Sequence, residues 1–137
     1  RFSARLDATR GWEPYYRRWV RTWESPAPDR LAVRDDYALA CGTGVEFYWN
    51  TRQEVEILPG RVVLRGRTGL VTLTVPADCT VRLEELPLLE GVQRRIAICR
   101  AGTRGRLEIE VTIEDLDSEH RRLALGMAGG EAPAIYR

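Results

Sequence analysis

The chain has 137 residues, of which 44% are hydrophobic and 30% are charged, so it is long enough for one folded domain and too apolar for a disordered protein. Its 21 basic residues, all of them arginines, nearly balance 20 acidic residues, which excludes the strong positive field expected of a nucleic-acid-binding protein. No apolar stretch is long enough for a signal peptide or a membrane span, and the start at Arg1 leads us to expect a piece of a longer protein.

Alternating apolar and polar residues predict β-strands along most of the chain. The first clear run, residues 15–24, mixes aromatic and arginine side chains on both of its faces. We expect a strand that is covered on both sides, with arginines that lie over aromatic rings or pair with acids such as Asp35 and Asp36.

Residues 31–39 form the next alternating segment. Two glycines in the turn at 41–44 supply positive φ angles, which predicts a hairpin into a strand at 45–49. Further short strands, separated by turns that contain Gly or Pro, are predicted at residues 62–64, 71–75, 80–83, 93–100 and 107–113.

Helical patterns are almost absent, and only residues 118–125 could form a helical turn or two. The chain therefore predicts an all-β fold, an antiparallel two-sheet β-sandwich of about ten strands over residues 1–115. Residues 116–137 are expected to form a short helical turn and tail of the same domain.

The residues that could bind a metal do not form a recognisable site. Cys41, Cys79 and Cys99 are too far apart for a zinc knuckle, and we expect buried free thiols. The carboxylates at 115–119 alternate as in a calcium loop, but His120 stands where that loop needs glycine. We expect no metal, no cofactor and a solvent-exposed His120.

Aromatic residues, including four tryptophans, suggest sugar binding as well as packing. Flat rings stack on the apolar faces of sugars, but Trp and Tyr also build cores and interfaces, and we expect that role for most of them. Trp12 is the main exception, because it lies in a predicted loop. The candidate substrate-binding residues are Trp12, Tyr16, Arg18 and Trp49, and we assign no catalytic residue.

Several of these predicted strands resemble segments of a known protein family. The run WVRTW at 19–23 is followed by LAVRDDY at 31–37, an arginine-containing strand and then a hydrophobic strand that ends in Asp. VEFYWNT at 45–51 and LTV at 73–75 continue the similarity. Over residues 1–115 the chain resembles the carboxyl-terminal β-sandwich region of bacterial heparinase II/III-like polysaccharide lyases.

The resemblance implies a parent enzyme in which an α/α toroid precedes β-sheet layers and acidic polysaccharide is cleaved by β-elimination. In that family the catalytic tyrosine lies on the toroid and the catalytic histidines in an earlier sheet segment, whereas this chain has one histidine, His120. We therefore expect a non-catalytic sandwich that supports the toroid and lines the substrate cleft. Its expected partners are the toroid and sheet segments of the parent chain and an acidic polysaccharide, with no nucleic acid and no membrane, in a periplasmic or secreted protein.

Two other functions remain open. An independent carbohydrate-binding module would present a planar row of exposed Trp and Tyr rings, and a structural or oligomerisation domain would bury the aromatic strand between subunits. A lyase portion would instead expose an apolar patch where the neighbouring domain packs.

Overall fold

The computed structural model describes residues 1–116, which form ten β-strands and one short 3-10 helix. In chain order the elements are β1 (Phe2–Asp7), η1 (Thr9–Trp12), β2 (Tyr16–Ala27), β3 (Arg30–Leu39), β4 (Gly44–Thr51), β5 (Glu54–Leu58), β6 (Arg61–Arg65), β7 (Gly69–Thr74), β8 (Cys79–Leu88), β9 (Gly91–Ala101) and β10 (Arg104–Asp115). The helical pattern predicted at 118–125, the tail and His120 lie outside the described residues.

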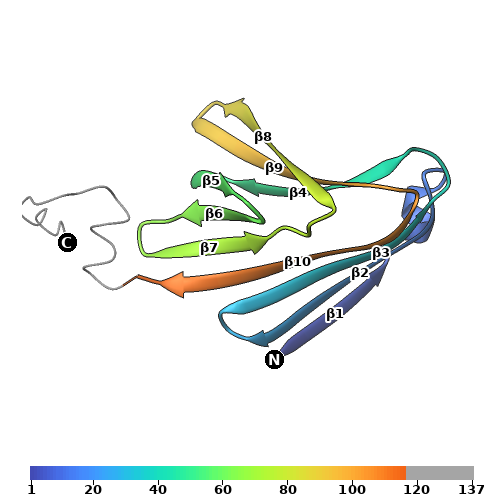
Figure 1. Cartoon of the computed structure of the whole chain (residues 1–137), viewed down its shortest axis with the longest axis horizontal. Helices are drawn as coiled ribbons and strands as arrows, with labels where there is room; N and C mark the ends of the chain where they lie inside the picture. The colour runs from blue at the N-terminus through green and yellow to red at the C-terminus, as the bar shows by residue number, and fades with distance from the viewer. Residues whose placement is uncertain (117–137) are drawn as a thin grey trace, which may run out of the picture.

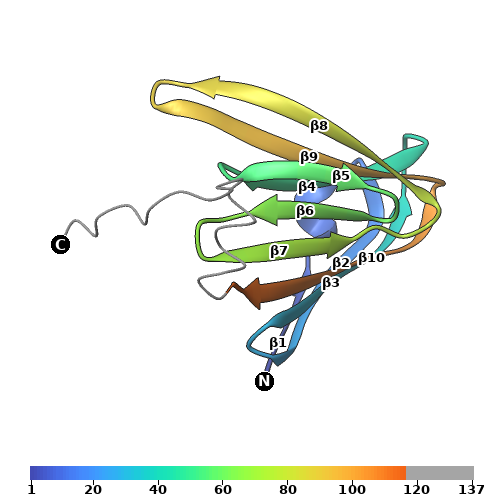
Figure 2. The ribbon, with the colours of Figure 1, turned by 60° about the vertical axis from the view of Figure 1, so that its left-hand side comes forward.

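The strands form two antiparallel sheets, so the predicted all-β sandwich is confirmed. One sheet has seven strands in the order β1-β2-β3-β10-β7-β6-β5, and the other has three in the order β4-β9-β8. Figures 1 and 2 show β8 and β9 on one side of the molecule and β1 at the far edge of the larger sheet. Because the smaller sheet has fewer strands, it covers only part of the larger one.

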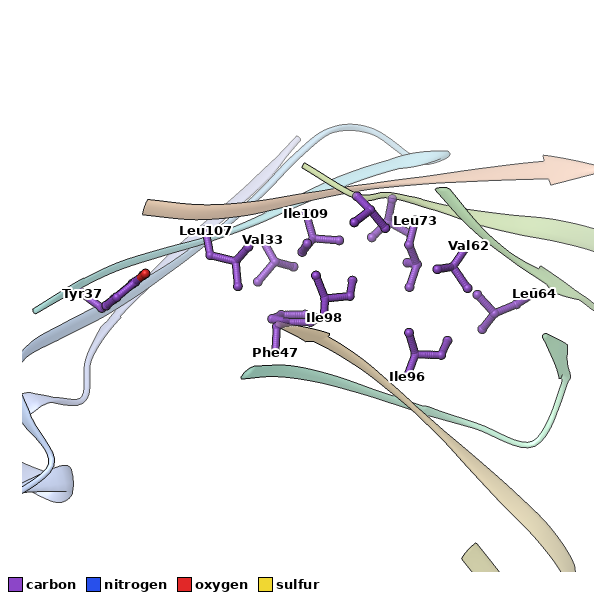
Figure 3. Close-up of a cluster of buried hydrophobic side chains, with 12 residues drawn as sticks. Val33, Tyr37, Phe47, Val62, Leu64, Leu73, Ile96, Ile98, Leu107 and Ile109 are labelled. Carbon is purple, nitrogen blue, oxygen red and sulfur yellow. The ribbon is translucent and has the colours of Figure 1, made fainter. Parts of the chain in front are cut away.

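The hydrophobic core lies between the two sheets (Figure 3). Ile96 and Ile98 of β9 point towards Leu73 of β7 and Ile109 of β10, and all four side chains have no exposed surface. The prediction that residues 107–113 form a strand with one buried face is therefore confirmed for the central part of β10. Leu107, Ile109 and Val111 are buried there, and Glu110 is exposed.

The turns show which connections the local pattern could predict. Gly60 adopts a φ of +71° in a tight hairpin between β5 and β6, where the sequence predicted a turn before the strand at 62–64 but not the strand β5. The prediction of a hairpin at 41–44 is wrong, because β3 pairs with β2 and β10 whereas β4 pairs with β9 in the other sheet. The turn instead connects the larger sheet to the smaller one. Phe47 of β4 can then pack into the core between the two sheets.

The aromatic strand β2 is covered on both faces only in part, which limits another expectation. Arg17 and Arg18 are exposed, whereas Trp19, Trp23 and the ion-paired Arg21 lie at least partly buried towards the core side. The smaller sheet lies against one face of the larger sheet only, and on the opposite face of β2 Val20 is buried whereas Arg18 is exposed.

All three cysteines are free thiols, but they are not buried as expected. Cys41 is exposed, and Cys79 and Cys99 are partly exposed. Cys79 shares its face of β8 with core residues, and burial raises the pKa of its thiol to about 11, with the neighbouring Asp78 adding to the rise.

Alkylation should therefore distinguish two of these thiols. At pH 8 about one Cys79 thiol in a thousand is ionised, and the thiolate is the reactive form. Treatment of the folded protein with iodoacetamide, followed by peptide mass spectrometry, should modify exposed Cys41 first. Labelling of Cys79 should accelerate about tenfold for each pH unit between 8 and 10, and equal labelling of both thiols at pH 8 would contradict this assignment.

Candidate functional site

A pocket of about 310 Å³ lies where β2, β3 and η1 meet the edge strand β4 of the smaller sheet. Five of its lining residues are aromatic, namely Trp12, Tyr16, Trp19, Tyr37 and Tyr48. Tyr37 and Leu107, which also lines the pocket, lie at the end of the core in Figure 3. We call this site the aromatic pocket, and its volume is at the small end of the range for ligand sites.

Three of these rings pack against one another. Tyr16 and Trp19 are stacked, with centroids 5.2 Å apart and planes 23° apart. Trp12 stands nearly perpendicular to both, at 76° to Trp19 with a centroid distance of 5.4 Å and at 85° to Tyr16. Because 49% of Trp12 is exposed, it is the ring of this group with the largest surface open to a ligand.

A hydrogen bond to Thr9 connects the loop that carries Trp12 to β2. The Thr9 hydroxyl donates a hydrogen bond of 2.6 Å to Asp7 Oδ1 and accepts one of 3.0 Å from the Trp19 backbone N–H. Hydrogen bonds from the Thr9 side chain and backbone hold the pKa of Asp7 below its ordinary value, so its carboxylate stays charged at neutral pH. These bonds place Trp12 against Trp19 before any ligand binds.

An arginine–aspartate pair lies on the inner side of the pocket. Arg21 Nε donates to Asp35 Oδ1 at 2.7 Å and Arg21 Nη2 donates to Asp35 Oδ2 at 2.6 Å, a two-point contact between neighbouring strands. The guanidinium also lies 5.4 Å from the Trp19 ring and 5.2 Å from the Phe47 ring. The predicted arginine pairing and stacking thus occur together in this one residue.

The rim is formed by Glu46 and Tyr48 of β4. The Tyr48 hydroxyl donates a hydrogen bond to Glu46, and Arg82 Nη2 of β8 lies 3.2 Å from the same carboxylate. The hydrogen bond from Tyr48, followed by that from Arg82, holds the pKa of Glu46 below its ordinary value. The rim therefore presents an ionised carboxylate to a ligand.

The structure brings together two of the four candidate substrate-binding residues. Trp12 and Tyr16 line the aromatic pocket. Arg18 lies beyond an irregularity in the β2–β3 pairing, shares a face with Ala38 and lines shallow depressions on the other side of the sheet. Trp49 is half-buried and packs against the core.

Other lining residues were not singled out as ligand-binding from the sequence. Arg21 and Asp35 were expected only as members of an ion pair between alternating strands, not as residues that line a ligand site. Glu46 and Tyr48 lie on the face of β4 opposite to Phe47, and reach the pocket because β4 is an edge strand. Only the pairing of β2 with β3 and the position of β4 beside them unite these side chains.

Comparisons with known proteins add no family assignment. Neither the family models nor the curated proteins include a match to this chain. Within residues 1–116, no cluster of three or more His, Cys, Asp or Glu side chains is arranged to hold a metal ion. That same range has no helix with the length and apolar character needed to cross a membrane.

Proposed function

We propose that this chain is a non-catalytic β-sandwich portion of a bacterial heparinase II/III-like polysaccharide lyase, which supports the toroid of the parent enzyme and holds a sugar unit in the aromatic pocket. The observation that carries the proposal is the half-exposed Trp12 ring, held at the mouth of a pocket beside the stacked pair Tyr16 and Trp19. A preformed aromatic surface beside hydrogen-bonding groups suits the apolar face and hydroxyl groups of a sugar ring.

The segments that resemble the lyase family support this proposal by their positions. Residues 19–23 lie in β2, residues 31–37 in β3 and residues 45–51 in β4. These three strands supply most of the pocket lining, including the Arg21–Asp35 pair. The residues behind the resemblance and those behind the ligand site are therefore largely the same.

An uncovered apolar surface supports packing against another segment of a parent chain. Phe2 and Leu6 of β1 share the inner face with Trp23 and Arg21 of β2, and they are 58% and 51% exposed. The smaller sheet does not reach this edge of the larger one. Apolar side chains that gather on an unoccupied face are typical of a surface that packs against a further domain.

An independent carbohydrate-binding module is the second candidate, because the half-exposed Trp12 ring lines a pocket beside hydrogen-bonding groups. The predicted planar row of rings is not found among the described residues, since Trp12 stands nearly perpendicular to its neighbours. A structural or oligomerisation domain would instead show a stable dimer by size-exclusion chromatography and no affinity for sugars.

Replacement of Trp12 by alanine should weaken saccharide binding about 30-fold, because truncation of a Trp that dominates a contact costs about 2 kcal/mol. The measurement is a titration of the 137-residue chain with fragments of heparin, hyaluronan, chondroitin and alginate, followed by tryptophan fluorescence and calorimetry. Tyr15→Ala is the matched control, because Tyr15 is exposed in the same loop but does not line the pocket.

The outcomes separate the candidates. No response of the unmodified chain to any fragment would rule out a saccharide site, and equal weakening by Tyr15→Ala would show that the pocket is not the place of binding. Release of unsaturated uronate by this chain alone would contradict the non-catalytic assignment. Loss of turnover by a parent lyase that carries Trp12→Ala, with the toroid intact, would favour the lyase portion over an independent module.

A further inference from the structure

The charges around the aromatic pocket specify which kind of sugar it accepts, an inference that rests on the proposed saccharide site. Three charged side chains line the pocket: Arg21, Asp35 and Glu46. One cation therefore stands against two carboxylates. A polysaccharide lyase acts on chains that contain uronates, so the question is whether the uronate or a neighbouring uncharged unit occupies this pocket.

Arg21 is the only cation among the lining residues, and its charge is already matched. Two of its N–H groups bind the two oxygens of Asp35, at 2.7 and 2.6 Å. Its guanidinium also lies 5.2 Å from the Phe47 ring, with the rings of Trp19 and Trp23 at 5.4 and 6.0 Å. The stacking and the two-point pairing hold the guanidinium in place.

A uronate carboxylate could bind Arg21 in the same two-point manner only by displacing Asp35. The Asp35 side chain is 10% exposed. Displacement would leave that carboxylate buried without its partner, and an unpaired buried charge is strongly unfavourable. The Arg21–Asp35 pair therefore acts as a neutral wall rather than as an anion-binding group.

The rim adds repulsion to this neutral wall. Glu46 is ionised, and its nearest cation, Arg82, is shared with Glu84 at 3.0 Å. A second carboxylate brought beside the exposed Glu46 would meet a like charge, while the further cation at this rim, Arg95 over the Tyr48 ring, already pairs with Glu84 at 3.8 Å. Glu46 is suited instead to accept hydrogen bonds from the hydroxyl groups of a ligand.

The remaining groups suit an uncharged ring. Burial, together with the negative charge of Asp35, raises the pKa of the Tyr16 phenol, so its hydroxyl stays protonated and can donate or accept a hydrogen bond. Trp12 offers an exposed aromatic surface. We infer that the aromatic pocket binds an uncharged pyranose unit, a neutral or N-acetylated hexose, and discriminates against the uronate.

The test compares two ligands that differ only in their carboxylates. An oligoglucuronate is titrated into the unmodified chain, and so is the same oligosaccharide after its carboxylates have been reduced to primary alcohols. The reduced form should bind at least tenfold more tightly. Its affinity should change little between 20 mM and 500 mM NaCl, because no ion pair with the protein forms.

A substitution tests the electrostatic origin of this preference. Glu46→Gln keeps a hydrogen-bond acceptor and removes the charge, so the ratio of the two affinities should shift at least threefold towards the acidic ligand. Glu56→Gln is the matched control, because Glu56 also pairs with an arginine on a strand, Arg65 of β6, but does not line the pocket. The ratio should stay unchanged in that variant.

Each result has a distinct meaning. Binding of neither ligand refutes the proposed saccharide site itself. Tighter binding of the acidic form, with an affinity that falls as salt is added, leaves the saccharide site standing and overturns the inference about its ligand. A ratio that Glu46→Gln does not move overturns the electrostatic explanation.

Discussion

Replacement of Leu73 by alanine is expected to lower the free energy of unfolding by about 2–5 kcal/mol. Leu73 has no exposed surface and lies in β7 between β6 and β10. It faces Ile96 and Ile98 across the space between the sheets (Figure 3). Truncation removes three carbons from this contact and leaves a cavity that the paired strands cannot close without breaking their hydrogen bonds.

Urea denaturation followed by tryptophan fluorescence measures this effect. Leu88→Ala is the matched control, because it removes the same atoms from the exposed end of β8 and should change stability by less than about 0.5 kcal/mol. Equal losses in the two variants would mean that the two sheets do not pack through Leu73 as described.

Asp35→Asn is expected to cost about 3 kcal/mol of stability, because it leaves the Arg21 guanidinium without its charge partner in a mostly buried position. The same unfolding measurement applies. The neighbouring Asp36 provides a closely matched control, since it also pairs with an arginine, Arg106, at 2.7 Å, but on the other face of β3. Asp36→Asn should cost less than about 1 kcal/mol, because that pair is more exposed.

A double variant separates the cost of an unpaired charge from the net contribution of the pair. Arg21→Met combined with Asp35→Leu should recover most of the stability lost in Asp35→Asn, because a well-packed apolar pair avoids the cost of desolvating two charges. A double variant as unstable as Asp35→Asn would indicate that the ion pair itself stabilises the contact between β2 and β3.

The fold class was predictable because the alternation of apolar and polar residues within each strand indicates which of its faces is buried. Leu107, Ile109 and Val111 alternate with polar residues whatever strand lies beside them, and this period of two predicts a strand with one buried face. Pro59 and Gly60 similarly indicate a turn before residue 62, because Gly60 adopts the positive φ that a tight turn needs. Interactions over a few residues are sufficient for both.

The choice of partner strand was not predictable in this way. The glycines at 41–44 look the same in a hairpin and in a connection between layers. Here they form a connection between layers, because β10 and β2 occupy both edges of β3. Phe47 of β4 then packs into the core from the opposite sheet. Pairings between distant segments, such as β3 with β10, compete for the same edge, and local pattern does not decide that competition.

The same distinction between local pattern and tertiary packing applies to the candidate site. The sequence by itself determined that aromatic residues and arginines would share β2, that Trp12 would lie in a loop before it, and that Asp35 was a suitable partner for an arginine. Only the tertiary structure decided that Arg18 faces away from the pocket, that Trp49 supports the core, and that Glu46 joins the site. The physical reason is that a strand's own alternation separates its two faces, whereas which face meets another layer depends on packing between segments far apart in the chain.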